Sequence, residues 1–108
     1  MPINFSYSEA IASNKALLES VKRAHELLAG VIGKTSRQVT EDWSLETAAK
    51  GLPRVELTLT DQETQEQISR RFSPEELNDG PSLLSRLDWL WGDLLKNVSH
   101  KLLEQMRS

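Results

Sequence analysis

The strongest constraint on the fold is a run near the C-terminus in which apolar residues recur every three or four positions. This spacing predicts one helix, capped by Ser82 and extending to about Met106. An apolar stripe on a helix is stable only when it packs against another element, so the rest of the chain must cover it. Leu83 and Leu90 are expected on the flank of the stripe. The stripe itself is predicted to contain Leu84, Leu87, Trp91, Leu94, Leu95, Val98, Leu102 and Met106.

A second helical pattern begins near Ser8 and continues to Gly30, and Gly30 and Gly33 are typical of a helix stop. Residues 31–43 fit two interpretations, an extension of this helix or a strand over 37–45. The strand is favoured, because apolar and polar residues alternate there and each glycine inside a helix costs about 1 kcal/mol. The apolar face of the first helix contains Ala10, Ile11, Leu17, Leu18, Val21, Ala24 and Leu28.

Residues 54–61 give the clearest strand, since apolar and polar side chains alternate along their whole length. A polar break separates them from a second alternating run over 67–72, which predicts a hairpin with a loop of about four residues. Residues 44–51 form a connection with a helical turn over 46–50. The sequence from Ser73 to Glu76 has the form of a capping box that opens a short helix.

The order of these elements predicts a single α+β domain over residues 1–108. It consists of a helix, an antiparallel meander of two or three strands, and a final helix, with both helices on one face of the sheet in two layers. A chain of 108 residues has room for one modest core of this kind.

Composition excludes several classes of function. The chain has 13 Lys and Arg against 16 Asp and Glu, a net charge of -3, which disfavours non-specific binding to nucleic acid or anionic membranes. It has no Cys, which excludes disulfides and thiolate metal sites. Neither a secretory signal nor an apolar run of about 20 residues is present, so we expect a cytoplasmic location and no membrane partner.

Residues suited to catalysis are sparse. His25 and His100 each lack a second ligand at metal-binding spacing on their own helix. Asp61, Glu63 and Glu66 lie around the predicted hairpin, where charged residues usually form a solvated turn. The segment 30–35 lacks the glycine spacing of a phosphate-binding loop. We therefore assign no catalytic, cofactor-binding or metal-binding residue.

Trp89 lies almost opposite the apolar stripe of the C-terminal helix. It either forms an interface or is covered by residues 44–53 or by Phe5 and Tyr7. An exposed tryptophan edged by basic residues is typical of protein interfaces. The residues predicted to bind a partner on this face are Trp89, Lys96, His100, Leu103 and Arg107.

The resulting hypothesis is a non-catalytic protein-interaction module that binds a protein partner or a second copy of itself. The alternative is a small-ligand or enzymatic pocket between sheet and helices, which uses Arg70, His100 or the hairpin acids. A third hypothesis is weak nucleic-acid binding through Arg54, Arg70 and Arg71, with neighbouring glutamates that reduce the positive field.

Overall fold

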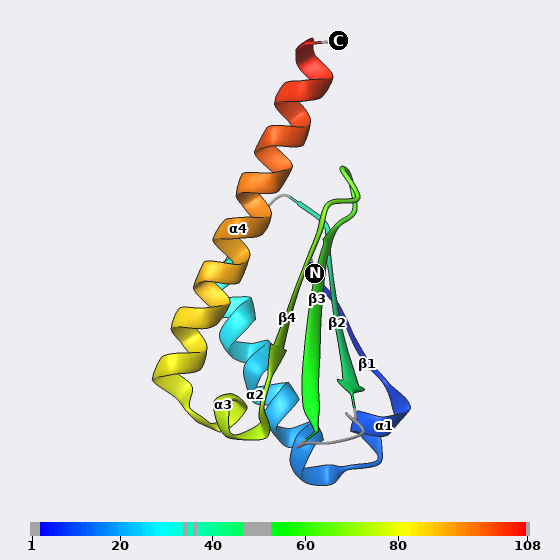
Figure 1. Ribbon diagram of the computed structural model, residues 1–108, viewed down its shortest axis with the longest axis vertical. Coiled ribbons are helices and arrows are strands. Elements are labelled where there is room, and N and C mark those ends of the chain that lie inside the picture. The colour runs from blue at the N-terminus through cyan, green and yellow to red at the C-terminus, as the bar shows by residue number, and fades with distance from the viewer. Residues whose placement is uncertain (1–2, 34, 36, 47–52, 108) are drawn as a thin grey trace.

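The computed structural model describes residues 3–33, 35, 37–46 and 53–107. These residues form an α+β fold with a four-stranded sheet and four helices, which confirms the predicted class (Figure 1). The helical turn expected over 46–50 lies, apart from residue 46, outside the described residues. The elements are β1 (Ile3–Tyr7), α1 (Glu9–Ala12), α2 (Lys15–Ile32), β2 (Val39–Glu46), β3 (Arg54–Asp61), β4 (Gln67–Phe72), α3 (Pro74–Asn78) and α4 (Gly80–Arg107).

The sheet has the strand order β1-β2-β3-β4 and is mixed. β2, β3 and β4 form the expected antiparallel meander, but β1 extends it by pairing parallel to β2, with Ile3 opposite Val39 and Tyr7 opposite Trp43. The prediction of an antiparallel sheet of two or three strands was therefore incomplete. A parallel pair needs a crossover connection, and α1 and α2 supply it.

The first helical pattern is divided in two, whereas the sequence predicted one helix from Ser8 to Gly30. α1 ends at Ala12, and a new helix, α2, begins at Lys15. The side chain of Asn14 caps α2 by accepting a hydrogen bond from the backbone N–H of Leu17 at 3.1 Å. α2 continues past Gly30 and ends at Gly33, whose φ of 63° favours glycine. The next element is β2, which confirms the strand interpretation of this segment.

α2 and α4 contact each other and pack on one face of the sheet, and the core lies between these two layers. β3 shows the alternation that creates the core: Val55, Leu57 and Leu59 are fully buried, while Glu56 and Thr58 between them are partly exposed. α3 begins with the predicted capping box, in which the Ser73 side chain and the Glu76 side chain bond each other's backbone N–H groups.

α4 is rotated about its axis relative to the predicted stripe. Leu83 and Leu90 are buried, whereas Leu84, Leu95 and Met106 are 44%, 36% and 81% exposed. The prediction was wrong for these three residues. α4 packs against both the sheet and α2, so the side of the helix that is buried faces the space between these two elements. α4 also begins at Gly80, two residues before the predicted cap.

Candidate functional site

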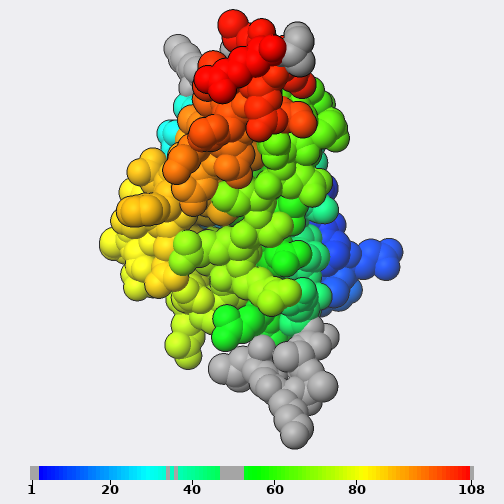
Figure 2. Space-filling view, turned by 45° about the horizontal axis from the view of Figure 1, so that its top comes forward, coloured from blue at the N-terminus to red at the C-terminus, as the bar shows by residue number. Residues whose placement is uncertain are grey.

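The predicted binding face of α4 is open to solvent. Trp89 is 71% exposed and Leu103 is 51% exposed, and Lys96, His100 and Arg107 are exposed as well. In Figure 2, the part of α4 drawn in orange and red lies at the surface of the molecule.

Neither aromatic residue of the N-terminal segment covers Trp89. Phe5 and Tyr7 lie in β1, and Phe5 stacks on the ring of His25 at a centroid distance of 4.1 Å. β1 is at the opposite edge of the sheet from β4, the edge strand that contacts α4. Of the other proposed cover, residues 44–53, the segment 47–52 lies outside the described residues.

The spacing along α4 aligns the exposed apolar residues with basic ones. Trp89, Lys96 and Leu103 recur every seven residues, so they lie on nearly the same side of the helix. His100 and Arg107 follow at the same spacing on the adjacent row. The result is a narrow surface on which Lys96 lies between Trp89 and Leu103, while Asp93 shares the adjacent row with His100 and Arg107.

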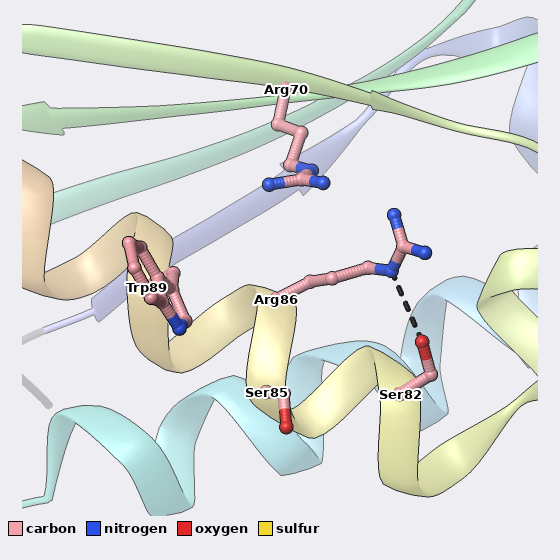
Figure 3. A pocket seen from close by; sticks show the side chains of 5 residues that line it. All are labelled: Arg70, Ser82, Ser85, Arg86 and Trp89. Atoms are coloured by element: carbon pink, nitrogen blue, oxygen red, sulfur yellow. Dashed lines mark hydrogen bonds between the residues drawn. The ribbon is translucent and has the colours of Figure 1, made fainter.

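A groove adjoins this surface between β4 and the first half of α4 (Figure 3). It has a volume of about 350 Å³ and is lined by Arg70, Ser82, Ser85, Arg86 and Trp89. Arg70 extends from β4 toward α4, and Arg86 extends from α4 into the space between them. The sequence analysis named Arg70 and Trp89 but missed Arg86, although its position three residues before Trp89 places it on the neighbouring side of the helix.

The proposed nucleic-acid residues do not form one surface. Arg54 and Arg71 lie on the outer face of the sheet, whereas Arg70 lies on the inner face opposite Leu57. The Arg71 guanidinium forms ion pairs with Glu46 at 2.9 Å and with Glu56 at 3.6 Å. Of the basic residues grouped together from the sequence, only Arg70 reaches the groove.

His25 belongs to a cluster that the sequence analysis missed. The side chain of Glu41 is fully buried on the inner face of β2, where its Oε1 lies 2.6 Å from His25 Nδ1. Its Oε2 accepts a hydrogen bond from Trp43 Nε1, also at 2.6 Å. Both carboxylate oxygens are thus occupied, and the cluster joins α2 to the sheet.

Of the hairpin acids, Asp61 is buried and has a structural role. Arg37 donates two hydrogen bonds to it, at 2.7 and 2.8 Å, and Thr64 donates two more across the turn. These bonds, those from Arg37 above all, lower the pKa of Asp61 from 3.8 to about 2. Glu63 is 70% exposed and pairs with the same Arg37. The described residues contain no group of three or more His, Cys, Asp or Glu placed to hold a metal ion.

Comparison of the chain with protein-family models, curated proteins and solved structures finds no match. Among the described helices, none is both long and apolar enough to cross a lipid bilayer.

Proposed function

We propose that this chain is a cytoplasmic, non-catalytic protein-interaction module that binds its partner through the exposed side of α4. One observation carries the proposal. Of the large hydrophobic residues described as exposed, all but Tyr7 lie on α4. They are Leu84, Trp89, Leu95, Leu103 and Met106. Trp89 and Leu103 share one side of α4, whereas Leu84 and Leu95 lie on another, and an exposed tryptophan is the stronger mark of an interaction surface.

Within α4, the proposed contact is the surface formed by Trp89, Lys96, His100, Leu103 and Arg107. Tryptophan is the residue type most enriched among interface residues that dominate binding energy. Lys96, between Trp89 and Leu103, favours a partner that places an acidic group between two apolar ones. The distal half of α4 also extends past the sheet, where an approaching protein meets little steric obstruction (Figure 1).

The test compares two pairs of substitutions on different sides of the same helix. Trp89→Ala with Leu103→Ala removes the proposed contact, and Leu84→Ala with Leu95→Ala is the matched control that removes apolar area elsewhere on α4. Light scattering measures the molar mass of each variant, and affinity capture measures retention of a hetero-partner.

The first pair should abolish self-association or partner retention while circular dichroism shows a folded monomer, and the control should bind like the wild type. Loss of binding in the control alone would place the contact on the other side of α4. Unfolding of the first pair would show that Trp89 and Leu103 stabilise the fold instead.

A further inference from the structure

The groove between β4 and α4 contains an arginine, Arg70, whose charge helps to lower the pKa of Glu76 but whose hydrogen-bond donors have no acceptor among the described residues. In the described part of the chain, Arg70 forms no ion pair or hydrogen bond, and its nearest aromatic contact is the Phe72 ring, 5.8 Å from the guanidinium carbon. Arg70 is nonetheless only partly exposed, on the inner face of the sheet. A guanidinium with free donors beside a cavity is suited to bind a carboxylate or phosphate.

The second arginine of the groove is held in place. Arg86 Nη1 lies 2.6 Å from Glu76 Oε2, and Arg86 Nε donates to the Ser82 hydroxyl at 3.1 Å. These two contacts fix the guanidinium between β4 and α4 (Figure 3). Two arginines and one glutamate leave a single uncompensated positive charge, which matches a monoanion better than a dianion.

Trp89 lines the same groove and offers a different interaction. Trp89 is 71% exposed as a whole residue, so its side chain is accessible to a ligand. A flat apolar group gains both burial and ring stacking by lying against such a ring. The groove volume of about 350 Å³ lies near the lower end of the range for small-molecule sites.

We propose that this groove binds a small aromatic carboxylate, whose carboxylate group is held by Arg70 and Arg86 and whose ring lies against Trp89. This ligand site goes beyond the proposed protein-binding function. Trp89 belongs to both surfaces, whereas Arg70 belongs to the groove alone, so substitution of Arg70 tests the ligand site separately.

The test uses benzoate as the probe, with binding followed by NMR through the backbone N–H signals of the groove residues Ser82, Ser85 and Arg86, which every variant retains. Benzoate should give a saturable shift with a Kd of about 1 mM or tighter. Acetate lacks the ring and benzamide lacks the charge, so both should bind more weakly. Phenyl phosphate, with its second negative charge, should not bind more tightly than benzoate.

Arg70→Gln should weaken benzoate binding about tenfold or more, because it removes the charged donor. Arg71→Gln is the matched control, since Arg71 is the next residue but lies on the outer face. Trp89→Ala, at an exposed position, should also weaken binding and gives a second test if Arg70→Gln does not fold.

The proposal is wrong if benzoate gives no saturable shift, or if folded Arg70→Gln binds it like the wild type. Equal binding of acetate or benzamide would also refute it. Tighter binding of phenyl phosphate would refute the assignment of a carboxylate.

Discussion

Replacement of His25 by alanine should destabilise the protein far more than its partial exposure suggests. The imidazole Nδ1 contacts the fully buried carboxylate of Glu41 at 2.6 Å. Without it, Glu41 keeps only the hydrogen bond from Trp43. A buried carboxylate that loses one of two partners retains the cost of its desolvation without the compensating interaction.

The size of the effect follows from this geometry. Loss of the His25 imidazole leaves one oxygen of the buried Glu41 carboxyl group without its hydrogen-bond partner, which costs about 1–3 kcal/mol. The His25 side chain is 20% exposed, so water can enter the space that it leaves, which favours the lower end of this range. Loss of the stacked contact with Phe5 adds about 0.5–1.5 kcal/mol. Since a domain is stable by about 5–15 kcal/mol in total, His25→Ala should remove a large fraction.

Urea denaturation, followed by circular dichroism, measures this loss. His100→Ala is the matched control, because His100 is an exposed histidine on α4 and should change the free energy of unfolding by less than about 0.5 kcal/mol. Glu41→Gln completes a double-mutant cycle, in which the double variant should cost less than the sum of the single variants. A loss below about 1 kcal/mol for His25→Ala would refute the argument that the pair is energetically important.

Three further perturbations test other parts of the fold. Leu83→Ala should lower the free energy of unfolding by about 2–5 kcal/mol, and Leu84→Ala by less than about 1 kcal/mol, because only Leu83 is buried. Thermal or urea unfolding measures both losses, and equal losses would contradict the observed rotation of α4. The lowered pKa of Asp61 contributes about 2 kcal/mol of stability that is fully present above about pH 4 and lost as the pH falls toward 2. Asp61→Asn should flatten this part of the stability–pH profile, and an unchanged profile would exclude Asp61 as its source. Ser73→Ala should cost about 1 kcal/mol by urea unfolding through loss of the capping box, and a neutral effect would show that packing alone holds α3.

Local patterns predicted the elements whose signals are complete within a few residues. β3 follows from strict alternation over Arg54–Asp61, and the capping box follows from the residues Ser73 to Glu76. β1 has only five residues and pairs with a strand that begins 36 positions after its own start, Val39 against Ile3. Its pairing depends on the crossover helices, which no local pattern contains.

The partner of Glu41 illustrates the same limit. The strand alternation already placed Glu41 on the face shared by Val39 and Trp43, and a carboxylate on a buried face requires a partner. The sequence therefore contained the signal that Glu41 is paired. Identification of His25 as the partner required the packing of α2 on β2, which only the structure supplies.

The candidate site was only partly predictable for a related reason. Helical spacing alone predicted Trp89 on the side of α4 opposite the core, and it is exposed. A pocket between sheet and helices that uses Arg70 was the alternative hypothesis, but the juxtaposition of Arg70 with Arg86 and Trp89 was missed, because Arg70 was also grouped with Arg71, its neighbour in sequence. In a strand, adjacent side chains point to opposite faces, so the alternation of β4 already separated the two.

The inner face of the sheet shows why Arg70 differs from the other charged residues there. In the part of the chain that the structure describes, the charged residues on this face are Glu41, Asp61 and Arg70. The first two are buried and each has a partner from outside the sheet, His25 for Glu41 and Arg37 for Asp61. Arg70 differs from both, because it is partly exposed, interacts with Glu76 only through its charge, and borders a groove on an edge strand. Its hydrogen-bond donors therefore face a space that an external anion can enter, which is the position that a carboxylate ligand requires.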